Sequence, residues 1–196
     1  IVSEIKPTYL WMLTSPKEDV IMDIGANIGC FAFLAGEKGY KKIVCYEPEP
    51  SNLELLKVNT KELENCEIVD KAILTNPNAT IDFFLPKNRR NMGSCSAYVK
   101  RGRDKISVKT INFKDEMERI KPNIIKMDVE GAEYDLLKTP LPHYVKKITI
   151  ELHLNKNQWR YEDAPELIDK FKNWKCIREP IIGEKNWHTI AKYERE

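Results

Sequence analysis

The sequence predicts an α/β fold in which a mostly parallel sheet carries helices on both faces. Short apolar runs rich in β-branched residues start at Val20 and recur at 42–47 and 123–129. Continuous runs of this kind are typical of parallel strands that are buried on both faces. Segments with helical spacing separate several of these runs, which favours crossover helices between parallel strands. A glycine turn follows the first run, as it does at the ligand-binding edge of open α/β sheets.

The individual elements follow from local patterns along the chain. Residues 1–17 are expected to form a helical lead-in, and Pro7 and Pro16 limit the length of any helix there. Ser51 is expected to cap the helix after the second strand, with Glu54 completing a capping box. After the strand that begins at Val20, the predicted elements are helix 29–38, strand 42–47, helix 51–64, strand 66–74, strand 80–85, strand 106–113, helix 114–120, strand 123–129, a helix opened by 130–133, strand 147–153, helix 164–171, and strands 175–179 and 187–193 as an antiparallel hairpin.

Composition is typical of a single-domain protein of a reducing compartment. The 196 residues fit one domain over 1–196, and the net charge of +2 demands neither nucleic acid nor a membrane as a partner. The five scattered cysteines form no C-x-x-C pair, which predicts free thiols rather than a disulfide framework or a zinc site. No apolar run approaches the roughly 18 residues of a membrane span, and no signal-like start is found. We therefore expect a soluble, cytoplasmic protein without a membrane partner.

The turn after the first strand reads Asp23-Ile24-Gly25-Ala26-Asn27-Ile28-Gly29, and four interpretations compete for it. Dinucleotide-binding folds have G-x-G-x-x-G, but Asn27 replaces the second glycine of that pattern. Phosphate loops require G-x-x-x-x-G-K-[ST], and no lysine follows at that spacing. The third interpretation is the acid-first glycine turn of class I S-adenosylmethionine methyltransferases, which this stretch resembles closely. The fourth is a strand-to-helix turn whose glycines only allow tight packing.

A ligand at this turn would lie against bare backbone and the start of a helix. Gly25 and Gly29 remove side chains there, and the helix that follows presents unpaired N–H groups. Glu47 closes the second strand 47 − 23 = 24 residues after Asp23, where a carboxylate can accept hydrogen bonds from ribose hydroxyls. Asp70, after the third strand, either accepts from an adenine amine or is a solvated strand-end acid. The candidate cofactor-binding residues are Asp23, Gly25, Ala26, Asn27, Gly29, Glu47, Pro48, Asp70 and Lys71.

Residues 87–105 differ in composition from the rest of the chain. The segment carries seven Lys or Arg residues against one acid, and Tyr98 lies within it. Long polar segments inside a compact domain are usually lids, binding loops or disorder. We interpret this one as a basic substrate loop that suits an anionic acceptor, whether a phosphate, a nucleotide-sugar or RNA. The alternative is an ordinary solvated loop.

Four charged residues near two later strand ends are the candidate catalytic residues. Lys126 and Asp128 lie two apart in one strand and therefore on one face. Charged side chains in a strand otherwise fit for burial are costly unless they are paired or functional. Asp128 is the first candidate for the base, or for the group that orients an acceptor hydroxyl, and Lys126 would hold it ionised or bind substrate. The alternative is a structural pair that holds strand to helix.

Glu151 and His153 repeat this spacing at the end of a neighbouring strand and are secondary catalytic candidates. The imidazole of His153 is expected to titrate near neutral pH, and a structural role for it is the alternative. Carboxylates at Asp128, Glu130 and Glu151 would suit Mg²⁺, which prefers oxygen ligands. Their spacing along the sequence defines no geometry, so we expect no metal.

With these elements in place, the chain resembles the FkbM family of methyltransferases over roughly residues 18–155. The resemblance is carried by the glycine turn, by Tyr46-Glu47-Pro48 before a Leu-rich helix, and most specifically by Lys126-Met127-Asp128-Val129-Glu130-Gly131-Ala132-Glu133. It implies a Rossmann-like class I methyltransferase fold, with a mostly parallel seven-stranded sheet whose last strand is antiparallel. It also implies S-adenosylmethionine as cofactor and methylation of hydroxyls, often on sugars or polyketide-type metabolites. Asn112 departs from the aspartate that the family tends to have, which weakens any role carried to that position.

The leading interpretation is therefore an S-adenosylmethionine-dependent O-methyltransferase of a small-molecule or sugar hydroxyl. The nearest alternative is an RNA (tRNA or rRNA) methyltransferase, which residues 87–105 favour but the near-neutral charge and the lack of a recognisable RNA module do not. A nucleotide-dependent oxidoreductase is disfavoured by Asn27, and a module that binds the cofactor without turnover is the last alternative. The acceptor molecule and the oligomeric state stay open at this point.

Overall fold

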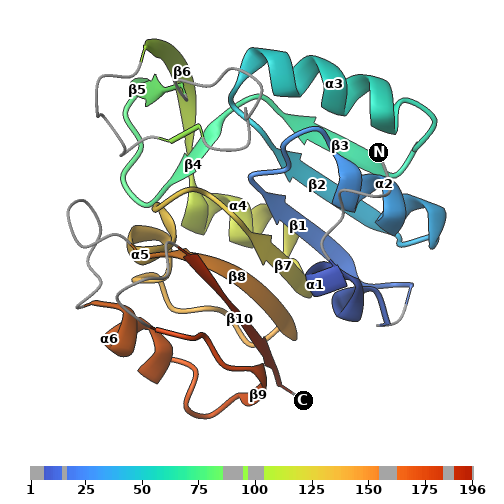
Figure 1. The fold of residues 1–196 in the computed structure, drawn as a ribbon. Helices are drawn as coiled ribbons and strands as arrows, with labels where there is room; N and C mark the ends of the chain where they lie inside the picture. Colours follow the sequence, from blue (N-terminus) through green and yellow to red (C-terminus); the bar gives the residue numbers. More distant parts are fainter. Residues whose placement is uncertain are drawn as a thin grey trace.

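The fold is built on a seven-stranded, mostly parallel sheet (Figure 1). The computed structural model describes residues 7–14, 17–85, 95–96, 104–154, 163–182 and 188–195. From one edge to the other, the strands of this sheet are β3 (Cys66–Val69), β2 (Lys42–Tyr46), β1 (Val20–Ile24), β7 (Ile124–Met127), β8 (Lys147–His153), β10 (His188–Glu194) and β9 (Lys175–Arg178). The first five pair in parallel, whereas β10 runs antiparallel to β8 and to β9. The predicted fold class, including the antiparallel last strand, is confirmed.

The order of the strands reverses between β1 and β7. From β1 the chain continues to β2 and β3 on one side, and β7 and β8 lie on the other side. Because these strands are parallel, their carboxyl ends meet at one edge of the sheet. Open α/β sheets bind ligands at such a reversal, so the residues that follow β1, β2 and β7 are placed where a ligand is expected.

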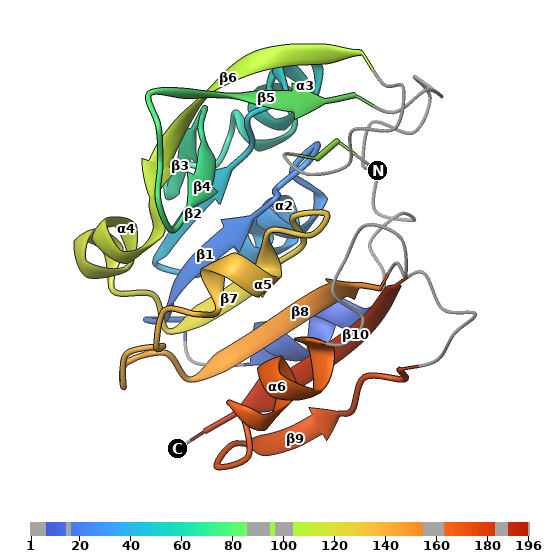
Figure 2. The ribbon, with the colours of Figure 1, turned by 90° about the vertical axis from the view of Figure 1, so that its left-hand side faces the viewer.

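Helices cover both faces of the central sheet, as predicted (Figure 2). One face carries α1 (Pro7–Leu10), the 3-10 helix η2 (Trp11–Thr14), α2 (Cys30–Glu37) and α3 (Pro50–Thr60), and the other carries α4 (Phe113–Ile120), α5 (Glu133–Leu136) and α6 (Ala164–Asp169). The first set packs on Ile21, Ile43 and Ile124, whereas the second packs on Met22 and Val44. Adjacent strand residues thus enter opposite cores, as the period of two requires.

A second, three-stranded sheet lies beside the central one and was not predicted. Its order is β4 (Ala72–Leu74), β6 (Lys105–Asn112) and β5 (Thr80–Phe84). The prediction of one continuous strand over 66–74 is wrong, because the chain leaves the central sheet after β3. Asp70 and Lys71 interrupt the apolar run there, and Asp70 is exposed. The extra strands predicted at 80–85 and 106–113 are confirmed.

Two helix starts differ from the prediction. Glu49, not Ser51, caps α3, because its buried carboxylate accepts a hydrogen bond of 2.7 Å from the backbone N–H of Asn52. The next residue is proline, which suits the first helical position. The helix predicted to open at Glu130 instead begins at Glu133, since Glu130 has a φ of 51° and Gly131 one of 109°.

Most of the predicted substrate loop at 87–105 lies outside the described residues. The structure describes Cys95, Ser96, Asp104 and Lys105 of this segment. Ser96 forms a bridge with Phe84 at the end of β5, so this part of the segment adjoins the small sheet. All five cysteines are free thiols. Among the described residues, no helix has the length and apolarity that a membrane span needs.

Candidate active site

A cleft opens at the carboxyl ends of β1, β2 and β7, where the strand order reverses. Its empty volume is about 620 Å³. Predicted residues that line it are Gly25, Asn27, Glu47, Pro48, Lys71 and Asp128. Lining residues that sequence reasoning missed include Ile73, Leu74, Phe83, Cys95 and Val129, and Glu130, which the sequence analysis considered only as a possible metal ligand, lines the cleft as well. Several of the missed residues belong to the small sheet, so their place in the cleft depends on the break after β3.

The remaining predicted site residues do not line this cleft. Asp23, Ala26 and Gly29 are buried, and the exposed Asp70 follows β3. Of the catalytic candidates, Lys126, Glu151 and His153 belong to β7 and β8 and do not line the cleft either. Their roles therefore stay predictions, and the contacts below indicate how each could act on the residues that do line it.

The glycine turn brings three strand ends into direct contact. Gly25 has a φ of 75°, and a Cβ atom at this position would lie 1.8 Å from the backbone oxygen of Asp128. The N–H groups of Gly25 and Ala26 both donate to the carbonyl of Tyr46, each at 3.0 Å. At Gly29, whose φ is 84°, a Cβ would lie 2.5 Å from Leu56 of α3. Tight packing within the chain thus favours glycine at both positions. A ligand that lies against Gly25 would be a second reason for the glycine there.

Glu47 presents a buried carboxylate at the cleft. One oxygen accepts from the N–H of Asn27 at 2.8 Å, and the other accepts from the N–H of Glu49 at 2.9 Å. Burial raises the pKa of Glu47 to about 7, although the two backbone donors oppose this shift. Asn27 itself has a φ of 52°, a conformation that asparagine tolerates better than most residues. The turn and the second acid are therefore one hydrogen-bonded unit.

Asp23 and Lys126 form a buried ion pair on neighbouring strands. The Nζ atom of Lys126 lies 2.9 Å from Oδ1 of Asp23 and donates to the backbone oxygen of Gly25 at 2.6 Å. Burial alone lowers the pKa of Lys126, but Asp23 and Asp128 more than reverse this, so its pKa is raised. Burial raises the pKa of Asp23, with Lys126 opposing. The pair therefore holds the glycine turn in place through the backbone oxygen of Gly25.

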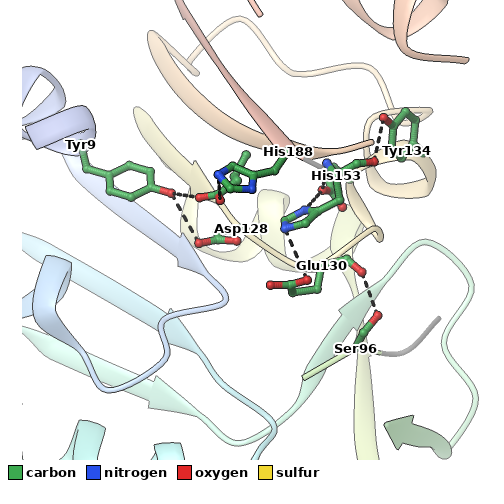
Figure 3. A network of polar contacts seen from close by, with 9 residues as sticks. Tyr9, Ser96, Asp128, Glu130, Tyr134, His153 and His188 are labelled. Carbon is green, nitrogen blue, oxygen red and sulfur yellow. Dashed lines mark hydrogen bonds and ion pairs between the residues drawn. The ribbon is translucent and has the colours of Figure 1, made fainter. Parts of the chain in front are cut away.

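A network of polar side chains lies next to Asp128 (Figure 3). The hydroxyl of Tyr9, from α1, donates to Oε2 of Glu151 at 3.0 Å and lies 3.4 Å from Oδ2 of Asp128. On the far side of Glu151, Nε2 of His188 lies 3.6 Å from its Oε1 atom. Burial raises the pKa of Asp128 to about 6, with Lys126 opposing and Glu151 adding to the shift. A carboxylate with this pKa suits proton transfer near neutral pH.

His153 lies between the carboxylates of Glu130, in the turn after β7, and Glu133, the first residue of α5. Its Nδ1 atom is 2.6 Å from Oε1 of Glu133, and its Nε2 atom is 3.4 Å from Oε2 of Glu130. The hydroxyl of Ser96 donates to the backbone oxygen of Glu130 at 2.7 Å. Burial alone lowers the pKa of His153, but the two carboxylates raise it well above its usual value. The expectation that His153 titrates near neutral pH is therefore wrong.

Comparison with known proteins agrees with this geometry. The methyltransferase FkbM domain matches residues 23–176. This range includes the residues that line the cleft, whereas Tyr9 and His188 of the network beside it lie outside the match. The chain belongs to the FkbM methyltransferase family. It is 28% identical over 167 residues to the hexuronic acid methyltransferase AglP of Haloferax volcanii, and the match covers 80% of this chain and 64% of AglP. The chain thus spans less than two thirds of that relative.

Solved structures agree with the fold of this FkbM family member. Precorrin-6y C5,15-methyltransferase from Geobacter metallireducens superposes with a TM-score of 0.52 at 12% identity, covering 95% of this chain and 85% of that one. The fibrillarin pre-rRNA processing protein of Methanococcus jannaschii gives a TM-score of 0.54 at 14% identity, covering 91% and 66%. The superpositions establish the class I methyltransferase fold. At such low identities they say nothing about the acceptor.

Proposed function

We propose that this methyltransferase uses S-adenosylmethionine to methylate a hydroxyl group on a sugar or another small molecule. The observation that carries the proposal is a cleft at the reversal of strand order with Glu47 and Asp128 among its lining residues. One acid is suited to hold the cofactor and the other to act on the acceptor. The FkbM family and the class I fold of the structural neighbours support the same cofactor.

The residues of the cleft fit an adenosyl ligand. A carboxylate has about four acceptor sites. The N–H groups of Asn27 and Glu49 and the side chain of Asn52 occupy three of those on Glu47, so Glu47 can still accept from a ribose hydroxyl. Ile73, Leu74 and Phe83 offer an apolar surface for a base. When bound, S-adenosylmethionine supplies a methyl group on a positively charged sulfur that keeps the bonding electrons.

Asp23 and Lys126 would act on this cofactor site indirectly. Lys126 holds the backbone oxygen of Gly25, and Asp23 holds Lys126, so the pair would position the turn rather than touch the ligand. We propose that Gly29, packed against Leu56, directs α2 in the same way. Lys71 lines the cleft and would contact the adenosyl group more directly than the exposed Asp70.

Asp128 would orient the acceptor hydroxyl and accept its proton. Asp128 lines the cleft, and its pKa of about 6 leaves its carboxylate mainly ionised at neutral pH. A positioned base typically contributes about 10²–10⁴-fold to a rate. Glu151 and His153 would support Asp128, Glu151 through the shared hydroxyl of Tyr9 and His153 through its positive charge.

A sugar acceptor is favoured over RNA. The 28% identity to a hexuronic acid methyltransferase supports a carbohydrate hydroxyl, and the basic composition of residues 87–105 suits an acceptor that carries an acidic group. RNA as acceptor rests on that same composition alone, since fibrillarin shares only the fold.

Ligand binding and methyl transfer test the proposal in two steps. We expect S-adenosylhomocysteine, but not NAD(P), to stabilise the protein, by about 2.7 kcal/mol at a concentration of 100 times its Kd. Labelled methyl transfer from S-adenosylmethionine is then compared for glycosides of hexuronic acids, neutral glycosides and bulk tRNA. Stabilisation by NAD(P) alone would refute the cofactor, and transfer to tRNA with a steep salt dependence would refute the acceptor class.

A further inference from the structure

Three metal-ligating side chains meet beside the cleft. The ligand atoms of Asp128, Glu151 and His153 all lie within 4.8 Å of one another. Asp128 directly follows β7, and the other two belong to the last three residues of β8, its parallel neighbour. Metal–ligand distances of about 2.0–2.6 Å place ligands on opposite sides of one ion roughly 4–5 Å apart. The spacing therefore suits a single divalent cation.

The surroundings of this triad carry an excess of negative charge. Besides Asp128 and Glu151, the carboxylates of Glu130 and Glu133 face the ring of His153. Glu133 is fully buried, and its Oε2 atom has no hydrogen-bond partner among the described residues. The ammonium of Lys126 is shared with Asp23. Without a metal, the positive charge of His153 pairs with Glu130 and Glu133. A divalent ion bound at Nε2 would displace one ring proton and bring two charges in place of one, and buried carboxylates are costly unless paired or bound to a metal.

The side chains that hold the triad are placed as in a metal site. Metal-ligating histidines usually donate their second ring nitrogen to a carboxylate, which fixes the ring. Oε1 of Glu133 occupies this position: it lies 2.6 Å from Nδ1 of His153 and also accepts from its backbone N–H at 3.1 Å. The opposite ring nitrogen, Nε2, lies 3.4 Å from Oε2 of Glu130, which borders the triad (Figure 3). Tyr9 orients the carboxylates of Glu151 and Asp128.

We propose that Asp128, Glu151 and His153 bind a divalent cation at the acceptor side of the cleft. This rests on the proposed function and changes one role in it: with the ion bound, Asp128 would be a ligand rather than the base. The ion would bind the acceptor hydroxyl and stabilise its deprotonated form, and Glu130, which lines the cleft, would accept the proton. Two carboxylates and one imidazole suit an ion that accepts both oxygen and nitrogen ligands, for which Mn²⁺ is a spectroscopic probe. Spacing along the sequence predicted no metal because it does not reveal that β7 and β8 bring these ends together.

Direct titration with Mn²⁺ tests the site without depending on methyl transfer. Electron paramagnetic resonance should show that the full chain binds one Mn²⁺. We expect the substitutions Asp128→Asn and His153→Gln each to weaken this binding at least tenfold. Glu133→Gln should weaken it by about 10–100-fold, as is typical when the partner of a ligating histidine is lost. His143→Gln and Asp82→Asn serve as matched controls and should stay within twofold. Both positions are exposed; His143 precedes the amino-terminal end of β8, whereas Glu151 and His153 lie at its carboxyl end, and Asp82 belongs to β5.

S-adenosylhomocysteine binding by the same samples separates this proposal from the proposed function. A triad variant that loses Mn²⁺ but binds S-adenosylhomocysteine normally is folded and supports the site. If the unaltered chain binds no Mn²⁺, or if the control variants lose as much affinity as the triad variants, the cation site is refuted, whereas normal S-adenosylhomocysteine binding leaves the methyltransferase proposal standing. Mn²⁺ binding without any S-adenosylhomocysteine binding would refute the proposed function instead.

Discussion

Replacing Glu47 by glutamine should weaken S-adenosylhomocysteine binding roughly 10- to 150-fold. The change keeps the shape of the side chain but removes its charge, and one of its two acceptor atoms becomes a donor. Of the two N–H groups that Glu47 accepts at 2.8 and 2.9 Å, one then loses its partner, and one ribose hydroxyl loses a charged acceptor. A hydrogen bond to a charged group contributes about 1.5–3 kcal/mol, and each 1.4 kcal/mol is tenfold in affinity.

Isothermal titration calorimetry at pH 8 measures this loss. Glu54→Gln, an exposed position on α3, is the matched control and should bind like the unaltered chain. An affinity of Glu47→Gln within threefold of the unaltered chain, in a protein with unchanged thermal stability, would show that Glu47 does not hold the ribose.

The same binding should depend on pH through Glu47. Its pKa of about 7 in the free protein means that the carboxylate needed for ribose hydroxyls is lost as pH falls through 7. At pH 6 the unaltered chain should therefore bind about tenfold more weakly than at pH 8, and Glu47→Gln should show no such change. The folded-state pKa also lies above the unfolded value of 4.5, so the contribution of Glu47 to stability is present below pH 4.5 and lost as pH rises toward 7.

Three further substitutions test the site. Asp128→Asn should lower kcat by about 10²–10⁴-fold while S-adenosylhomocysteine still binds, and an unchanged kcat would rule out its role on the acceptor. Gly25→Ala should destabilise the fold by more than about 2 kcal/mol in urea unfolding, because its Cβ meets the oxygen of Asp128; Gly39→Ala has the same sign of φ but open space, and an equal loss there would reduce the effect to backbone strain. Lys126→Met should cost about 3–5 kcal/mol by leaving Asp23 buried and unpaired, whereas Lys105→Met breaks the exposed pair with Asp82 and should cost no more than about 1 kcal/mol.

The proposed cofactor-binding part of the site, the glycine turn and Glu47, could be predicted because its residues form local sequence patterns. The apolar run from Val20, the glycines after it and the acid at Glu47 each have a pattern within a short window, and the structure joins them by the hydrogen bond from Asn27 to Glu47. Asp128 could be predicted for the same reason, since it follows a recognisable strand.

The network around Asp128, where the methyl acceptor is proposed to bind, was only partly predictable because its contacts join residues that are distant in sequence. Tyr9 meets Glu151 across 142 positions, and nothing in the residues around Tyr9 distinguishes it from an ordinary aromatic anchor. The apolar cleft residues Ile73 and Phe83 were missed because two polar residues, Asp70 and Lys71, divert the chain into a second sheet. His153 was recognised, but its protonation depends on Glu133, which only the fold brings next to it.

The anchoring of the first helices to β8 has a consequence for how the protein is made. Trp11 donates to the hydroxyl of Thr149 at 2.9 Å across 138 positions, and Tyr9 reaches Glu151 across 142. A ribosome that adds about 5–20 residues per second needs roughly 7–30 seconds to make the partners of these side chains. During that interval the newly made α1 and η2 lack their final docking surface, so chaperone contact is expected to concentrate on them until β8 leaves the exit tunnel.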